Sequence, residues 1–192
     1  MAGPTSFGYQ NLGFGAGGSA ASGALTLIKA NTFSGDSTVT INNIKEDVYN
    51  VHFFTVELSG AHHDITVFLD FSTDNGSSFI TDDLAYSKSY GQTDGTFNQH
   101  TSADLYGVPM FSTLDANLGA GGYGYMYSAG DSGRHTYVNT HAIFEKKGDG
   151  GVQKMEFGGG GTTADQVVDA FRLYPNQGTI TGKYALYGLE QS

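Results

Sequence analysis

Short stretches in which apolar and polar residues alternate recur along most of this chain, and this period of two constrains the fold more than any other feature. The clearest stretch is Ile65–Ser72, in which Ile65, Val67, Leu69 and Phe71 occupy every second position. In an extended strand these side chains lie on one face, and leaving so apolar a face in water is costly. The pattern therefore predicts a β-strand that buries this face.

Similar stretches between Gly, Asn, Asp and Ser clusters predict about ten consecutive strands, with almost no helical periodicity. Because a sheet of that length usually folds over or closes, we predict an all-β, antiparallel two-sheet β-sandwich of jelly-roll type over residues 24–192. Besides Ile65–Ser72, the predicted strands are Leu25–Ala30, Ser37–Ile44, Tyr49–Leu58, Val108–Leu114, Tyr123–Ser128, His135–Glu145, Val152–Phe157, Val168–Tyr174 and Thr179–Leu189.

Two turn sequences predict tight hairpins between these strands. Asp74-Asn75-Gly76 supplies residues that accept a positive φ, and Pro175-Asn176-Gln177-Gly178 separates the last two strands. Only Thr163–Phe171 competes as a helix, because Thr163 and Gln166 fit a capping box. The segment is short, so a one-turn helix and an extended conformation both stay open there.

The first 23 residues have the composition of an arm, rich in Gly, Ala and Ser, with the spaced aromatic residues Phe7, Tyr9 and Phe14. Fixing such a chain costs on the order of 1–2 kcal/mol per residue, and the segment has little apolar surface to offset that cost. We expect an extended arm over residues 1–23 that becomes ordered only against other subunits, with the aromatic side chains as anchors.

The charge pattern argues against several classes of function. The formal net charge is −10, from 19 acidic and 9 scattered basic residues, so neither nucleic acid nor an anionic membrane is an expected partner. The chain has no Cys and therefore no disulfide or thiolate metal site. Without a basic leader or an apolar run near the roughly 20 residues of a membrane span, neither classical secretion nor membrane insertion is expected.

Three motifs match catalytic or nucleotide-binding sequences but lack their context. Gly130-Asp131-Ser132-Gly133, with His63 upstream, matches the nucleophile motif of chymotrypsin-like proteases, yet the flanking residues do not, so we predict a polar turn. Gly13–Gly18 matches a dinucleotide fingerprint without the strand and helix that it requires. Gly158–Gly161 lacks the Lys-Ser/Thr of a phosphate loop and predicts a flexible connector. We expect no catalytic residues and no cofactor.

Three further patterns are explained by local structure. Ala61-His62-His63-Asp64 offers ligands that suit zinc or nickel, but neighbouring strand residues point to opposite faces, so we expect a hydrated hairpin loop and no metal site. His141 stands alone in its strand, whereas catalysis needs a second positioned group. Ser72–Phe79 fits the Asp-box turn of sialidase propellers but occurs once, so it shapes a turn and does not indicate a glycosidase.

Tyr123-Gly124-Tyr125-Met126-Tyr127 places three tyrosines on one face of a strand. Three interpretations stay open: packing within the subunit, contact with another subunit or partner, and stacking against sugar rings. The candidate assembly contacts are therefore Phe7, Tyr9, Phe14, Tyr123, Tyr125 and Tyr127.

Several segments together resemble a widespread family of small tailed-phage virion proteins, common in marine phages. These segments are Ser37–Ile44 followed by Tyr49-Asn50-Val51, the Ser72–Phe79 turn, and the ending from Phe171-Arg172-Leu173-Tyr174 to Tyr184–Gly188. The resemblance runs from about residue 24 to the end of the sequence. It implies a jelly-roll-like sandwich without enzymatic activity that assembles as an oligomer, commonly a trimer, on the virion.

These observations favour a non-enzymatic structural protein of a tailed-phage virion, assembled in the host cytoplasm. A capsid decoration or cement protein that contacts the major capsid protein or other virion proteins is the first expectation, because the chain has neither heptads nor internal repeats from which a fibre shaft could be built. The alternatives are a tail-fibre or receptor-binding module that contacts host-surface glycans, and a glycan-binding domain outside a virion.

Overall fold

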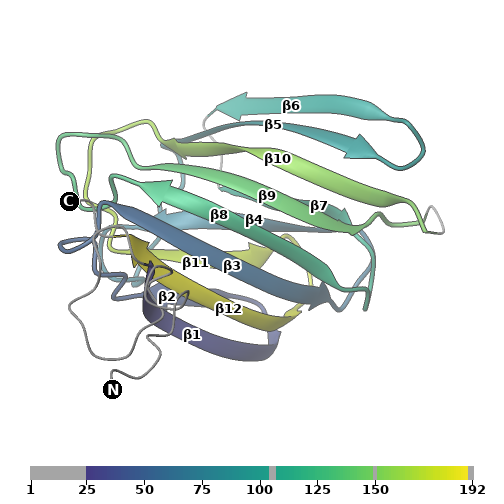
Figure 1. The fold of residues 1–192 in the computed structure, drawn as a ribbon, viewed down its shortest axis with the longest axis horizontal. Coiled ribbons are helices and arrows are strands. Elements are labelled where there is room, and N and C mark those ends of the chain that lie inside the picture. Colours follow the sequence, from purple (N-terminus) through teal and green to yellow (C-terminus); the bar gives the residue numbers. More distant parts are fainter. Residues whose placement is uncertain (1–24, 104–106, 149–150, 190–192) are drawn as a thin grey trace, which may run out of the picture.

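The computed structural model describes residues 25–103, 107–148 and 151–189, and within these ranges all regular structure is β (Figure 1). Twelve strands form two antiparallel sheets that pack face to face, with the orders β1-β12-β3-β8-β9-β10-β5-β6 and β2-β11-β4-β7. The strands are β1 (Leu25–Asp36), β2 (Val39–Asn42), β3 (Val51–Gly60), β4 (Ile65–Ser72), β5 (Leu84–Gln92), β6 (Phe97–Ala103), β7 (Val108–Leu114), β8 (Ala120–Tyr127), β9 (Tyr137–Glu145), β10 (Gln153–Thr162), β11 (Ala170–Pro175) and β12 (Ile180–Leu189).

Eight of these strands form a jelly roll, as the sequence predicted. The run β1 to β4 lies antiparallel along the run β7, β8, β11 and β12, with the nested pairs β1·β12, β2·β11, β3·β8 and β4·β7. Nested pairing of this kind, wrapped into two sheets, defines the jelly-roll topology. Two hairpins are inserted into the roll, β5–β6 between β4 and β7 and β9–β10 between β8 and β11, and both extend the larger sheet beyond β8.

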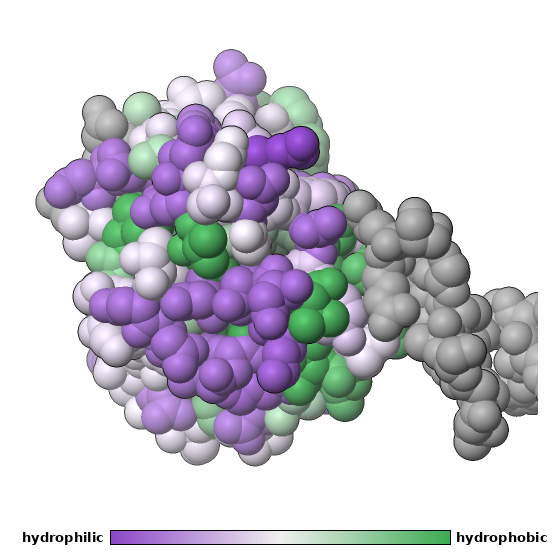
Figure 2. All heavy atoms as spheres, turned by 90° about the vertical axis from the view of Figure 1, so that its left-hand side faces the viewer, coloured by the Kyte–Doolittle hydropathy of each residue, from purple (hydrophilic) through white to green (hydrophobic). Residues whose placement is uncertain are grey.

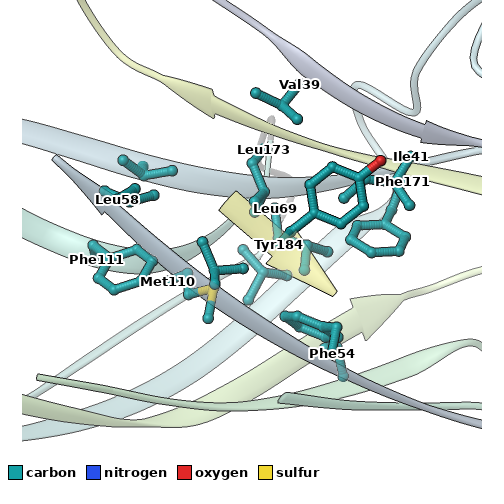
Figure 3. Packing of buried hydrophobic residues seen from close by; sticks show 14 of the residues in the cluster. Val39, Ile41, Phe54, Leu58, Leu69, Met110, Phe111, Phe171, Leu173 and Tyr184 are labelled. Atoms are coloured by element: carbon teal, nitrogen blue, oxygen red, sulfur yellow. The ribbon is translucent and has the colours of Figure 1, made fainter. Parts of the chain in front are cut away.

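The core lies between the inward faces of the two sheets. Ile65, Val67, Leu69 and Phe71 of β4 are at most 1% exposed, which confirms the predicted buried face. Side chains of the opposite sheet meet them, and Figure 3 shows these layers interdigitating. Since each buried side chain of this size contributes roughly 1.5–3 kcal/mol, the core accounts for most of the stability of a chain without disulfides.

Both turns that were predicted as hairpins connect the two sheets instead. Asn75 and Gly76 do have positive φ values of 57° and 85°, but the chain passes from β4 in the smaller sheet to β5 in the larger one. The turn after β11 likewise leads to β12 in the opposite sheet, and Asn176 there exchanges hydrogen bonds with Thr66. A turn sequence specifies that the chain changes direction locally. Which sheet the next strand joins depends on the strand pairing of the whole jelly roll.

The helix considered for Thr163–Phe171 does not form. Residues 163–169 are irregular, and β11 begins at Ala170. The N–H of Thr163 donates to the carbonyl of Asp83 at 2.8 Å, and the N–H of Val168, which is fully buried, donates to the carbonyl of Ala129 at 2.7 Å. Tertiary hydrogen bonds and burial therefore override the weak local helix signal.

The glycine run Gly158–Gly161 was predicted as a flexible connector, but it forms the second half of β10. These residues pair with β9 on one side and β5 on the other. A Cβ atom on Gly158 would lie 2.4 Å from the carbonyl oxygen of Ser87, and one on Gly159 would lie 2.2 Å from that of Val138. The neighbouring strands thus approach too closely for side chains at these positions.

Candidate functional site

The three tyrosines of β8 lie on the outer face of the eight-stranded sheet, away from the core. Gly124 and Met126 between them point inward and are buried, whereas Tyr123 is 42% and Tyr127 37% exposed and Tyr125 is half-buried. The predicted common face of the tyrosines is therefore confirmed. The rings do not pack between the sheets, so their outward surfaces face solvent.

Aromatic residues of neighbouring strands join these tyrosines into one continuous surface. The ring of Phe53 on β3 lies 4.9 Å from that of Tyr125 and 6.0 Å from that of Tyr187 on β12, measured between centroids. On the other side, the rings of Tyr123 and His141 on β9 are parallel within 4° at 5.1 Å, and Phe157 on β10 lies 6.4 Å beyond His141. We name this surface the aromatic face: Phe53, Tyr123, Tyr125, Tyr127, Tyr137, His141, Phe157 and Tyr187.

The register of the strands explains why these side chains meet. Outward positions form rows across the sheet, and each row takes one residue from β12, β3, β8, β9 and β10 in turn. Three adjacent rows hold no Asp, Glu, Lys or Arg. These rows are Leu189–Val51–Tyr127–Tyr137–Gly161, Tyr187–Phe53–Tyr125–Asn139–Gly159 and Ala185–Thr55–Tyr123–His141–Phe157.

Apolar side chains continue the surface at its margins. Leu25 and Leu27 of β1 and Ile143 and Met155 of β9 and β10 occupy outward positions and are more than half exposed. Charged side chains enter only in the next row, where Glu57 and Lys183 form an ion pair with 2.9 Å between Oε2 and Nζ. A contiguous exposed apolar surface of this kind marks an interaction site.

Two hollows interrupt the aromatic face. One, of about 480 Å³, is lined by Phe53, Tyr123, His141 and Met155 among others. The second, of about 560 Å³, lies over Gly159 and Gly161, and Tyr127 and Tyr137 are among the residues that line it. The missing side chains of the glycines thus create a recess beside protruding tyrosines. Such a surface can accept flat or apolar groups, with tyrosine hydroxyls and the Asn139 amide available for hydrogen bonds.

The protease-like motif is the polar turn that its context predicted. The N–H of Gly133 donates to Oδ1 of Asp131 at 2.9 Å, and the N–H of Arg134 donates to the carbonyl of Asp131 at 3.3 Å. His63 is hydrogen-bonded to Asp115, and Nε2 of His135 lies 3.2 Å from Oδ1 of Asp165. These pairings place each imidazole beside a surface carboxylate.

The Ala61–Asp64 segment is a loop, but it leads from β3 in the larger sheet to β4 in the smaller one and does not form the predicted hairpin. Oδ2 of Asp64 pairs with Nζ of Lys147 at 3.0 Å, so this carboxylate already has a cationic partner. In the described ranges, no three His, Cys, Asp or Glu side chains are grouped so that they could hold a metal ion.

The Asp-box sequence shapes the turn after β4. Asp74 accepts hydrogen bonds from the N–H and hydroxyl of Ser78 and from the hydroxyl of Ser72, and these bonds lower the pKa of Asp74 to about 2. The ring of Phe79 lies 4.0 Å from the guanidinium carbon of Arg172. The aromatic residue of the motif therefore covers the outside of the smaller sheet.

A buried charged cluster, which the sequence did not reveal, lies under the extended part of the larger sheet. Oε1 of Glu156 on β10 lies 2.7 Å from Nζ of Lys154, and Oε2 of Glu156 lies 3.3 Å from Nζ of Lys88 on β5. Nζ of Lys154 also lies 4.1 Å from the centroid of the Tyr90 ring. Burial lowers the pKa of Lys88, and Glu156 opposes that change. Lys88 and Lys154 also donate hydrogen bonds to the hydroxyl and the carbonyl of Ser112, so the cluster joins β5 and β10 to β7 of the smaller sheet.

Phe7, Tyr9, Phe14 and the Gly13–Gly18 motif lie outside the described residues. In the part of the chain that the structure describes, no helix is long and apolar enough to span a membrane.

Fold and surface together define a jelly-roll β-sandwich protein with an exposed aromatic face. No family model and no curated protein matches this chain.

Proposed function

We propose that this chain is a non-enzymatic structural protein of a tailed-phage virion, and specifically a capsid decoration or cement protein on the particle surface. The observation that carries the proposal is the aromatic face, a broad, uncharged surface that a protein acting alone has no reason to leave in water. The virion is proposed as the location because the strand and turn segments resemble those of small tailed-phage virion proteins. The compact sandwich supports decoration over a fibre, which needs an elongated shaft.

The chemistry of the described surface supports a binding role. The aromatic face offers stacking surfaces and hydroxyl groups, but it lacks a nucleophile with an adjacent general base. In the protease-like motif, the residue that would attack, Ser132, is an exposed turn residue. The surface most suited to a ligand is thus built mainly from stacking and hydrogen-bonding groups.

The test is to locate the protein on particles. Purified protein is added to particles that lack it, and bound copies are counted and imaged on the capsid and the tail. We expect regularly spaced copies on the capsid. Copies at the tail tip alone would support the fibre alternative, and no binding to any part of the particle would refute the proposal.

A second candidate function is recognition of host-surface glycans. The parallel Tyr123 and His141 rings beside the 480 Å³ hollow favour it, since sugar rings stack on flat aromatic surfaces whose edges offer hydrogen-bonding groups. Purified protein should then block adsorption of the phage to its host. Undiminished adsorption at saturating protein concentration would leave decoration as the better proposal.

A further inference from the structure

We propose that the aromatic face is the interface between copies of this chain, so that its partner is the aromatic face of a second copy. This inference rests on the proposed structural role and names the partner of the same surface. Four properties of the surface support it: extent, charge, shape and composition.

The aromatic face is large enough for a stable interface. With strands about 4.8 Å apart and outward residues about 6.8 Å apart along each strand, the five strands and three uncharged rows of the face cover roughly 24 by 20 Å. That projected area is on the order of 500 Å². A typical stable interface buries about 800 Å² on each partner, so the face and its apolar margins supply most of what is needed.

Charge favours a second copy at this face over contact elsewhere. At a net charge of −10, two copies repel each other, and the repulsion is smallest where both surfaces are uncharged. The three central rows meet that condition. The loops at the end of the sandwich where β8 finishes are different, and Figure 2 shows mainly hydrophilic residues there. Their acidic residues include Asp74, Asp82, Asp83, Asp131, Asp165 and Asp169.

The shape of the face allows it to fit a copy of itself. Tyr137 is 54% exposed and stands beside the recess over Gly159 and Gly161, so projection and recess lie on one surface. In a twofold-symmetric pair, each copy contributes the same patch, and the ring of one copy can enter the recess of the other. Tyrosine suits this role because it buries a large area while only two side-chain torsions are fixed.

The test measures the mass of the full chain in solution, without particles. We expect an oligomer for the wild type, and at least a tenfold weaker association for Tyr123→Glu combined with Phe157→Glu, because both side chains are exposed on the face. The matched control is Val48→Glu with Val167→Glu, which changes two exposed apolar residues away from the face and should leave the mass unchanged. Melting curves establish that all variants fold.

A second measurement keeps the proposal testable if the charged variants fail to fold. A photoreactive phenylalanine at position 123 should crosslink to the aromatic face of another copy. A wild-type monomer at micromolar concentration, or crosslinks to another surface, would overturn the inference. An oligomer that does not bind particles would contradict the proposed virion role alone, and a monomer that binds them would contradict only the self-association.

Discussion

Arg172 on β11 donates two hydrogen bonds to Oδ2 of Asp70 on β4, from Nη2 at 2.8 Å and from Nε at 3.1 Å, and the carboxylate of Asp70 is fully buried. The two residues are direct cross-strand partners on the outer side of the smaller sheet. The rings of Phe79 and Tyr174 lie 4.0 Å and 4.4 Å from the guanidinium carbon. The ion pair is therefore shielded by aromatic side chains.

Because of this pair, the contribution of Asp70 to stability decreases as pH rises, which is the reverse of the usual behaviour of an ion-paired carboxylate. Burial raises the pKa of Asp70 to about 6, because the cost of desolvation outweighs the hydrogen bonds and the charge of Arg172. The unfolded chain has a pKa near 3.9 at this position, so between about pH 4 and pH 6 the folded state binds more protons. The contribution of Asp70 to stability is therefore greatest below about pH 4 and decreases as pH rises to 6, by at most about 3 kcal/mol.

The variant Asp70→Asn isolates this effect, since other carboxylates titrate equally in both proteins. Urea unfolding at pH 4 and pH 7 should show that the wild type loses stability relative to the variant at the higher pH. An equal difference in unfolding free energy at both pH values would mean that Asp70 titrates normally.

Truncation of Leu69 tests the core. Leu69→Ala should lower the free energy of unfolding by about 2–5 kcal/mol, because it leaves a cavity between the sheets. Leu69→Asp, which buries an unpaired charge, should abolish soluble folded protein. Val167→Ala, at an exposed position, serves as the control and should change stability little. An unchanged urea midpoint for Leu69→Ala would show that the predicted face is wrong.

Two glycines of β8 provide a matched test of close strand packing. A Cβ atom at Gly124 would lie 2.5 Å from the Phe54 ring and 2.6 Å from the carbonyl oxygen of Asn139, whereas one at Gly121 would meet nothing within 4 Å. Gly124→Ala should therefore destabilise the fold by about 1–3 kcal/mol through overpacking, and Gly121→Ala should not. Thermal melting of both variants measures the difference, and equal melting temperatures would contradict the expected clash.

The turn at Gly130–Gly133 should be chemically inert. Ser132→Ala is expected to leave melting temperature and oligomeric mass unchanged, because Ser132 is an exposed turn residue. A fluorophosphonate probe should not label the wild type under conditions that label a serine protease. Covalent modification at Ser132 would instead indicate an activated nucleophile.

The sequence predicted those strands in which one face is buried. β9 alternates buried and exposed residues, and β4 alternates apolar residues on the core side with mostly polar residues on the outer side, so period-two patterns reveal both strands. β6 escaped prediction because it is exposed on both faces, which removes the alternation. β5 escaped because its two buried residues are Leu84 and the charged Lys88, which do not form an apolar pattern. The second half of β10 consists of glycines, whose absent side chains carry no pattern.

The aromatic face was only partly predictable. The three tyrosines of β8 are visible in one short segment. Phe53, Phe157 and Tyr187 come from strands far apart in the sequence, and only the pairing register brings their rings beside those of β8 and β9. A single strand reveals which of its side chains share a face, but not whether that face turns toward the core or toward solvent.

The outer inserted hairpin, β5–β6, needs the inner one, β9–β10, for its place in the sheet, but the inner hairpin does not need the outer one. β9 pairs with β8 of the jelly roll, whereas β5 reaches the sheet through β10 alone, and β6 through β5. Without β5–β6, the strands β9 and β10 would still pair with β8 and with each other, but without β10 the hairpin β5–β6 would have no strand to join. Removal of the outer hairpin therefore leaves the rest of the larger sheet paired, whereas removal of the inner hairpin takes away the pairing of both.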